Sequence, residues 1–573
     1  MRKGTVNRLP AKVRERDQVR MTPTARERTV GAGVALAAAL LLLPGLGGMD
    51  LWAPDEPRYA EIADEIVRSN AGSSWLLLEL NGEAYTQKPP LYYWLAALAG
   101  SSDNRVSASD ARLPSALAGI AAVFLTYRLG IHVFSNPRAA AYAALLLLTS
   151  FRFAHTARRA QLDVLLTAFE ILALLAFVRQ GRGIGSRKIN VALFHASLGA
   201  AVLTKGPVGL LPLVVVAAWL TWERRPNDLR GWFPAWGLAL SLGPTLLWFS
   251  IALALAPPGF FESAVVENLF GRFFAGTSHP RPLTYYLVQF PADFMPWTIL
   301  WPLAAVAVAR NWKSWTAPTS ENGWRFGFAW LGVFLLFFSL STGKRGLYLL
   351  PAFPAAALLC GAYLDHALAN RPSLPVGIRW SIGFALAIVT AGSLFLFLGP
   401  PVEIEPGFEI PPTFSATAAG LSFVALVLHL ACSGRPNAAK AQVNLILAWV
   451  FFMEVGLFAV GYPAFDAEKS PRPIARAANR IAGPDGTIGL YRESALLGGL
   501  IYYGRLYGDR PVVSLSNTAD VDVFFERGGK VLVARRQDLS SFRNLEEIEF
   551  LRSGERAIGL ATRAHGEPGP FHN

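Results

Sequence analysis

Runs of about 20 apolar residues, the length of a helix that crosses a bilayer, recur along most of this 573-residue chain. Charged residues make up only 16% of the chain, against about 25% in a typical soluble domain. Helices in a soluble core are rarely apolar on all sides over such a length. The pattern therefore predicts an all-α, multi-pass membrane protein.

We expect thirteen transmembrane helices between residues 29 and 465. The predicted spans cover residues 29–49, 111–134, 138–160, 164–180, 190–205, 207–222, 232–257, 296–310, 325–342, 347–366, 377–399, 413–432 and 441–462. The fifth and sixth spans are separate helices only if the chain breaks at Lys205-Gly206-Pro207.

The charges of the connections predict the orientation of the chain. Residues 1–28 hold nine Lys and Arg against three acids and directly precede the first apolar run, as a basic cytoplasmic tail does. The loop 50–90 has eight acids and three bases, and the loop 400–412 has three acids and no base. We therefore expect a cytoplasmic N-terminus and an extracytoplasmic C-terminus. The net charge of +13 is explained by these positions and does not indicate nucleic-acid binding.

The last segment, residues 466–573, is polar and alternates strand-like with helix-like stretches. The strand-like stretches are Thr487–Tyr491, Pro511–Leu515 and Lys530–Ala534. This alternation predicts a small α/β domain outside the membrane.

Unusual polar and aromatic residues fall at the predicted external ends of the spans or in the external loops, above all in the loop 50–110. They are Asp55, Glu56, Tyr59, Tyr85, Lys88, Asp163, Glu267, His279, Lys344 and Tyr348. Ionisable groups close to a membrane are costly and usually functional. We therefore expect them to meet in one outward-facing pocket.

The first loop predicts a short helix that begins at Asp55. The carboxylate of Asp55 suits a helix cap, and Pro57 suits the first turn. Apolar side chains follow at helical spacing over residues 59–66, which predicts a helix lying on the membrane surface. The alternative to a functional role is that Asp55 is only a cap and Glu56 only a first-turn acid favoured by the helix dipole.

Basic residues near the same interface suit an anionic lipid headgroup. Lys88 precedes two prolines, which hold it in an extended conformation, and its alternative role is an interfacial lysine that reaches for water. Arg158 lies close before Asp163, and the alternative there is a structural ion pair. Lys344 and Tyr348, at the start of a later span, again suit a phosphate.

Together these motifs resemble one family. Asp55-Glu56-Pro57-Arg58-Tyr59, Asn81-Gly82 and Lys88-Pro89-Pro90 resemble the first-loop signature of the lipid A aminoarabinose transferases. Those enzymes belong with the protein O-mannosyltransferases among the glycosyltransferases of the GT-C fold. Later blocks match in the same order: Leu162-Asp163, Lys205-Gly206-Pro207, Glu267-Asn268 with Arg272, and Lys344 to Tyr348.

The resemblance implies an enzyme that moves a sugar from a polyprenyl-phosphate donor to a lipid, glycan or protein acceptor, with inversion, at the outer face of the bacterial inner membrane. It implies catalytic roles for Asp55, Glu56 and Asp163, and a further site role for Glu267, Asn268 and His279. The implied donor-phosphate ligands are Arg58, Tyr59, Tyr85, Lys88, Arg158, Arg272, Lys344 and Tyr348.

One position departs from the family pattern. Gln87 stands where the family often has a glutamate, and an amide is a poor metal ligand. No cofactor is predicted with a defined site. A divalent metal bound by His279 stays open, but Gln87 argues against it.

Two other classes of function remain at this stage. One is a transporter or flippase of lipid-linked sugars, although the nearly uncharged spans lack the midplane charges that transporters show. The other is a non-catalytic membrane scaffold with a degenerate pocket. Transfer assayed in detergent, where no bilayer has to be crossed, separates the enzyme from the transporter.

Overall fold

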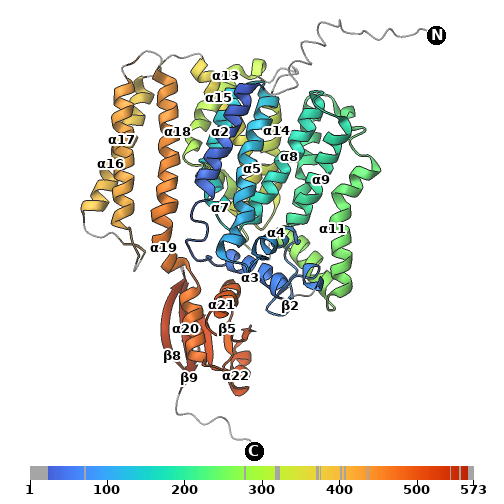
Figure 1. The fold of residues 1–573 in the computed structure, drawn as a ribbon, viewed down its shortest axis with the longest axis vertical. Helices are drawn as coiled ribbons and strands as arrows, with labels where there is room; N and C mark the ends of the chain where they lie inside the picture. The colour runs from blue at the N-terminus through green and yellow to red at the C-terminus, as the bar shows by residue number, and fades with distance from the viewer. Residues whose placement is uncertain are drawn as a thin grey trace, which may run out of the picture.

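A computed structural model describes residues 24–564 except 70–71, 276–278, 316–322, 370–372, 375, 400–402, 406–407, 434, 436–437, 543 and 554–555. The described chain forms a bundle of long, roughly aligned helices with a small sheet domain at one end (Figure 1). We call this end the domain end of the bundle. Most of the predicted basic tail, residues 1–23, lies outside the described residues.

Eight helical stretches in the described residues are long and apolar enough to cross a membrane. They are α5 (Ala108–Phe134), α9–η2–α10 (Arg187–Lys205, Gly206–Leu210, Leu211–Trp222), α11 (Ala235–Leu255), α14 (Gly323–Leu340), η6–α15 (Gly346–Ala352, Phe353–Ala369), α16 (Val376–Leu398), α17 (Pro412–Ser433) and α18–η7–α19 (Ala438–Gly456, Leu457–Gly461, Tyr462–Lys469). The protein is therefore a polytopic, mainly helical membrane protein, as predicted.

The predicted count of thirteen spans is not confirmed, because several predicted spans are short or bent. Two bent pairs raise the count to ten at most: α7–α8 (Phe151–Ala157, Leu162–Gly181) and α12–α13 (Tyr285–Asp293, Leu300–Trp315, joined through η5, Trp297–Ile299). These pairs bend by 109° and 113°. The predicted span 138–160 is α6 (Pro137–Leu148) followed by the short α7, and the first helix is α2 (Ala25–Leu42).

The predicted break after Lys205 is confirmed. Gly206 has a φ of 79°, outside the helical range, and the 3₁₀ turn η2 follows it. A Cβ atom at Gly209 would lie 2.5 Å from the backbone of Ala201 and Val202, so the chain folds back on α9 at this turn. Two shorter elements, η3 (Pro226–Leu229) and the π-helix η4 (Glu262–Ala275), flank α11.

The first loop holds α3 (Asp55–Arg68), η1 (Gly72–Trp75), the hairpin β1–β2 (Glu79–Leu80, Glu83–Ala84) and α4 (Leu91–Gly100). Asn81 and Gly82 both have positive φ, as a two-residue hairpin turn requires. The helix α3 begins at Asp55 as predicted, but no side chain caps it. Asp55 is thus the first helical residue and its carboxylate serves another purpose.

The apolar face of α3 packs against protein, and the position of α3 on the membrane surface stays a prediction. Its apolar side chains Tyr59, Ile62, Ala63 and Ile66 are all buried, and α3 packs between α4 and the C-terminal helix α21 (Ser494–Gly504). Helical periodicity shows that a face is covered, but not whether lipid or protein covers it.

The C-terminal domain contains a five-stranded sheet with the order β6-β5-β7-β9-β8. Its strands are β5 (Ile488–Tyr491), β6 (Val512–Leu515), β7 (Val531–Arg535), β8 (Leu545–Ser553) and β9 (Arg556–Arg563), and its helices are α20 (Arg472–Ala482), α21, α22 (Thr518–Glu526) and α23 (Arg536–Leu539). The three predicted strands are β5, β6 and β7, which pair in parallel.

The antiparallel hairpin β8–β9 was not predicted. β8 lies at the edge of the sheet, and charged residues interrupt its apolar pattern. A smaller hairpin, β3–β4 (Glu403–Glu405, Phe408–Glu409), joins α16 to α17.

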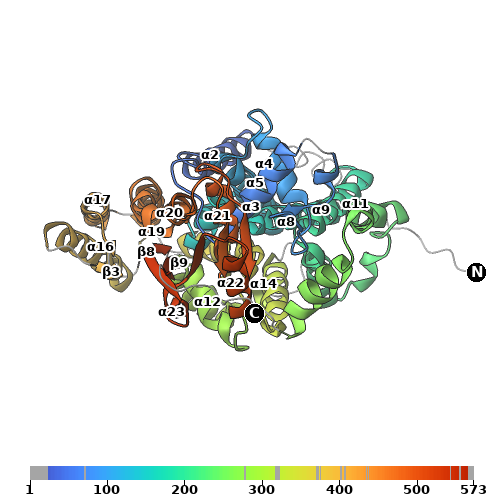
Figure 2. The same cartoon turned by 90° about the horizontal axis from the view of Figure 1, so that it is seen from below.

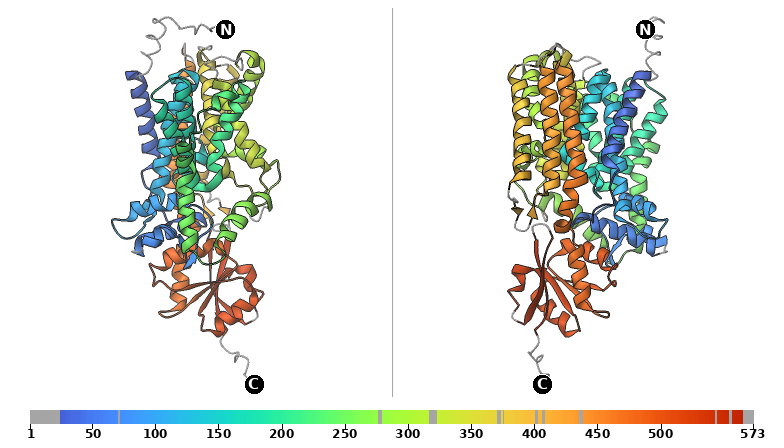
Figure 3. Two further views of the ribbon diagram at one scale, coloured as in Figure 1. Left: turned by 90° about the vertical axis from the view of Figure 1, so that its right-hand side faces the viewer. Right: turned by 60° about the vertical axis from the view of Figure 1, so that its left-hand side comes forward.

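The C-terminal domain covers only part of the bundle, as the view from below shows (Figure 2). The helices α16 and α17 project to one side of it, and the start of α2 lies at the opposite end of the bundle (Figure 3). This leaves α3, α4 and the domain ends of α5, α8 and η6 close to the C-terminal domain.

Candidate active site

Asp55 is held between positively charged groups from different parts of the chain. It is 3% exposed; one carboxylate oxygen lies 2.5 Å from Arg58, and the other lies 3.0 Å from Arg345 and 3.5 Å from the amide of Gln161. Burial alone would raise the pKa of Asp55, but the charges of Arg345 and Arg58 lower it to about 2. Asp55 is therefore an ionised carboxylate at neutral pH.

Glu56 has a different role from its neighbour. Its carboxylate accepts hydrogen bonds from Arg112 at 2.8 and 3.1 Å and from the backbone N–H groups of Trp52 and Ala160, and it pairs with Arg159 at 3.2 Å. Burial would raise its pKa, but the two arginines lower it to about 2. Because both oxygens are occupied, Glu56 ties α3 to α5 and to the turn before α8 and has no acceptor left for a ligand.

Of the adjacent pair Lys344 and Arg345, it is Arg345 that reaches Asp55, whereas the sequence analysis named Lys344 as a phosphate ligand. The Lys344 amine is buried and donates to the carbonyl oxygens of Ser341 and, at 3.1 Å, Arg281. It holds together two segments of the chain and does not contact Asp55.

Asp163 opens α8, and it pairs with Lys205, the last residue of α9. The ammonium group of Lys205 also lies 4.6 Å from the centre of the Tyr348 ring. Lys205 therefore bridges two predicted site residues, Asp163 and Tyr348. The sequence analysis named this lysine only in the break Lys205-Gly206-Pro207 and in the matching family motif.

These contacts form a closed ring. Asp55 contacts Arg345, the residue directly before η6. One turn further along η6, Tyr348 contacts Lys205. Lys205 pairs with Asp163, and Gln161, two residues earlier, returns to Asp55. Segments from α3, α8, α9 and η6 thus meet at the domain end of the bundle.

A set of tyrosines lines one side of Arg58. Its guanidinium lies 5.3 Å from the Tyr59 ring, which packs edge-on against Tyr93 at 5.6 Å. Tyr93 in turn packs against Tyr85 and donates a hydrogen bond to its hydroxyl at 3.3 Å. The predicted site residues Arg58, Tyr59 and Tyr85 are therefore neighbours of Asp55.

Arg158 is not part of this group. Its guanidinium donates to the carbonyl oxygens of Leu41 at 2.7 Å and Pro44 at 2.6 Å, and it stacks on the Phe458 ring at 4.6 Å. These contacts secure the end of α2, because unpaired carbonyl groups there need donors. The structure therefore places the Arg158 guanidinium on groups other than Asp55 and its partners.

The segment before α4 brings Lys88 close to η4. The hydroxyl of Thr86 accepts a hydrogen bond from Asn268 at 3.1 Å and lies 3.0 Å from the hydroxyl of Ser263. Lys88 is half-buried two residues further along. Asn268 therefore has a fixed place beside the Lys88 segment.

The other loop candidates do not join the ring. Glu267 is exposed on η4, and His279 is exposed with a positive φ. The carbonyl group of His279 accepts a hydrogen bond from the backbone of Lys344. The side chain of Arg272 lies outside the described part of the chain. Within the described residues, no three His, Cys, Asp or Glu side chains gather as a metal site needs.

Three charged residues at the site escaped the sequence analysis. Arg112 lies near the start of a predicted span, where a buried arginine on the acidic side departs from the charge rule. Arg159 and Arg345 directly follow the residues that were named. Each carried a signal, but only the folded chain shows which member of an adjacent pair points inward.

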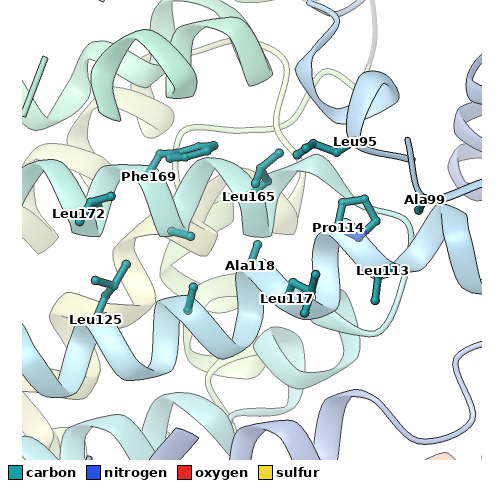
Figure 4. A pocket seen from close by; sticks show the side chains of 12 residues that line it. Leu95, Ala99, Leu113, Pro114, Leu117, Ala118, Leu125, Leu165, Phe169 and Leu172 are labelled. Carbon is teal, nitrogen blue, oxygen red and sulfur yellow. The ribbon is translucent and has the colours of Figure 1, made fainter. Parts of the chain in front are cut away.

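An apolar groove of about 280 Å³ lies beside the site (Figure 4). Its walls come from α4, α5 and α8. Two of its residues are neighbours of site residues in the sequence. On α5, Leu113 directly follows Arg112, which pairs with Glu56, and on α8, Leu165 lies two residues after Asp163. The groove is lined by apolar residues alone: Leu95, Ala99, Leu113, Pro114, Leu117, Ala118, Ala121, Leu125, Leu165, Ala168, Phe169 and Leu172.

Known proteins are similar to this chain in sequence and architecture. Residues 31–262 match the family model described as dolichyl-phosphate-mannose-protein mannosyltransferase. Two relatives from Pseudomonas fluorescens (strain Pf0-1) are undecaprenyl phosphate-α-4-amino-4-deoxy-L-arabinose arabinosyl transferases 2 and 1. The first is 31% identical over 65% of this chain and 65% of its own length, and the second is 30% identical over 77% and 74%.

A solved structure shows the same fold. ArnT from Cupriavidus metallidurans, bound to undecaprenyl phosphate, superimposes with a TM-score of 0.71 at 21% identity, over 95% of this chain and 99% of that one. The fold and the arabinosyl transferase relatives define a polytopic membrane glycosyltransferase of the GT-C class.

Within that class, the chain belongs to the ArnT-like family of its arabinosyl transferase relatives. The predicted fold and enzyme class are confirmed, and the transporter alternative is not supported.

Proposed function

We propose that this chain transfers a sugar from a polyprenyl-phosphate donor to a lipid, glycan or protein acceptor. The proposed reaction takes place at the outer face of a bacterial inner membrane, with the N-terminus in the cytoplasm and the domain end outside. The observation that carries the proposal is the ionised and buried Asp55, held by the partly exposed cations Arg58 and Arg345. The relatives of this chain are named for transfer from an undecaprenyl-phosphate sugar, so that donor is the first to test.

The cations of the ring suit the phosphate of the donor. The bond from sugar to phosphate breaks during transfer, so negative charge grows on the leaving phosphate. Arginines bind such groups through paired hydrogen bonds. We assign this role to Arg58 and Arg345, assisted by Lys88, Tyr348 and Lys205, and we assign the apolar groove beside α5 to a lipid chain.

Asp55 is suited to orient the acceptor. A carboxylate with a pKa of about 2 is a weak general base at neutral pH, because efficient bases have a pKa near the working pH. Donor phosphate that draws Arg58 and Arg345 away from Asp55 would raise that pKa. The carboxylate would then become a stronger base once the donor is bound, in time to accept a proton from a hydroxyl acceptor.

We assign structural roles to Glu56 and Asp163, the two other predicted catalytic residues. Glu56 supports the loop through its arginines, and Asp163 holds Lys205 in place. We infer that no metal is held through Gln87 and His279, because an amide and a single imidazole make a poor ligand set. Transfer that is lost with a chelator and restored by Zn²⁺ would contradict this inference.

Transfer by the purified full-length protein in detergent tests the proposal. The assay uses a labelled undecaprenyl-phosphate sugar and membrane lipids as acceptor, with the product identified by mass spectrometry. We expect Asp55→Asn and Arg345→Gln to lower kcat at least about 100-fold, in line with the loss of one preorganised charge. Asp103→Asn, which changes an exposed carboxylate in the same loop, is the matched control. Wild-type activity in both site variants would reject the proposal.

A further inference from the structure

The C-terminal domain touches the helix that carries Asp55 at its first turn. A Cβ atom at Gly498 of α21 would lie 2.5 Å from the Cα of Arg58 and 2.7 Å from its backbone nitrogen. Real Cβ atoms do not approach this closely. Only glycine therefore allows α21 to press against the turn that begins with Asp55.

The next residue secures the same contact from the other side. A Cβ atom at Gly499 would lie 2.5 Å from Pro471, which precedes α20, and 3.8 Å from Pro57 of α3. The glycine pair thus lets α21 pack closely on the backbone of Arg58 and on the ring of Pro471.

The far end of α21 holds the rest of α3. Arg505, which follows α21, pairs with Glu61, with Asp64 at 2.9 Å and with Glu65 at 2.9 Å. Tyr502 donates a hydrogen bond to the carbonyl group of Val106 at 2.8 Å, in the segment just before α5. α3 is therefore fixed by the C-terminal domain along most of its length.

We propose that α21 positions Asp55 for catalysis, through the close packing of Gly498 on Arg58 and the ion pairs of Arg505 with α3. Asp55 and its partner Arg345 belong to elements almost 300 residues apart, separated by 3.0 Å. A shift of the first turn of α3 by about 1 Å would break this alignment, and misplacement of that size can cost about 100-fold in rate. This inference rests on the proposed function.

The C-terminal domain is thus a working part of the catalytic centre. Gly498 and Arg505 are positioning residues, since neither contacts Asp55 itself. Their effect should appear in kcat more than in the KM of the donor, because Arg58 is the one proposed phosphate ligand on α3 and the others lie on other segments.

Gly498→Ala and Arg505→Gln in the full-length protein test the proposal. We expect each to lower kcat by about 10- to 100-fold, with less than a threefold change in the KM for the undecaprenyl-phosphate sugar. Arg505→Lys should recover part of the loss. The matched controls are Gly420→Ala, at a helical glycine with open space around it, and Arg480→Gln, which removes an exposed ion pair of the same domain.

The outcomes separate the two proposals. A wild-type protein that transfers no sugar rejects the proposed function. An active wild type with unchanged kcat in both Gly498→Ala and Arg505→Gln overturns the positioning role. The positioning role is also overturned if kcat falls only in proportion to the amount of monodisperse protein that still binds donor. That result would indicate that the variant fails to fold and not that Asp55 is misplaced.

Discussion

Adjacent residues at this site do different work because a helix turns about 100° per residue, so neighbours point in different directions. Asp55 faces the cations of the ring, while Glu56 faces the arginines that support the loop. Lys344 and Arg345 lie in the non-helical segment before η6, with Arg345 in an extended conformation, where successive side chains point to opposite sides. Lys344 therefore binds backbone carbonyl groups, whereas Arg345 reaches Asp55. The sequence showed that charge gathers at these positions, but it did not show which charge meets a substrate.

A substitution at Glu56 tests whether this residue supports the loop. Glu56→Gln leaves Arg112 and Arg159 buried or half-buried without their anion, and breaking a buried pair typically costs about 3–5 kcal/mol. We expect a marked fall in the thermal midpoint of the detergent-solubilised protein. Asp228→Asn, which removes an exposed pair with Arg225, should change stability by less than about 1 kcal/mol. Equal midpoints for Glu56→Gln and wild type would show that Glu56 does not support the loop.

At the scale of elements, α3 is the piece that joins the site to the C-terminal domain. Its first turn carries Asp55, the proposed catalytic carboxylate, and its later turns carry Glu61, Asp64 and Glu65 toward Arg505. Three carboxyl groups share one guanidinium, so one of them is better protonated. Burial, opposed by Arg505 and reinforced by Asp64 and Glu65, raises the pKa of Glu61 to about 8.

This raised pKa predicts a pH-dependent contact between α3 and α21. The unfolded Glu61 loses its proton near its ordinary pKa of 4.5, whereas the folded group keeps it until about pH 8. The stabilisation is therefore complete below about pH 4.5 and falls as the pH rises to about 8. The protection factors of the α21 amides, which correct the exchange rates for the intrinsic effect of pH, should fall over this range in the wild type, and Glu61→Gln should remove that change. A pH response that persists in Glu61→Gln would assign it to Asp64, Glu65, Arg68, Arg505 or Asp509, which surround the same site.

At the scale of the whole molecule, the chain gathers its unusual residues at one end of an apolar bundle. Asp55, Asp163 and Tyr348 lie far apart in sequence, and their elements all end beside the C-terminal domain (Figure 1). This arrangement suits a donor whose lipid chain lies in the membrane while its phosphate reaches the interface. It also requires that the domain end faces outward.

Labelling with a membrane-impermeant maleimide tests the orientation. In a chain whose two natural cysteines are replaced, Asp485→Cys in the C-terminal domain should react from outside in intact spheroplasts. Asp228→Cys, in the basic connection between α10 and α11, should react only after permeabilisation. The opposite pattern would invert the topology and place the site in the cytoplasm.

The sequence by itself determined the membrane class, because hydropathy is a local property that a bilayer reads directly. It also determined the enzyme family, because the family's motifs can be recognised along the chain without knowledge of the fold. It also located β5, β6 and β7 and the break after Lys205. The tertiary structure alone decided that Arg345 and not Lys344 meets Asp55, that Arg158 serves α2, and that protein covers α3. Those outcomes depend on which distant segment packs against each side chain, and a repeating pattern along one segment carries no information about its partner.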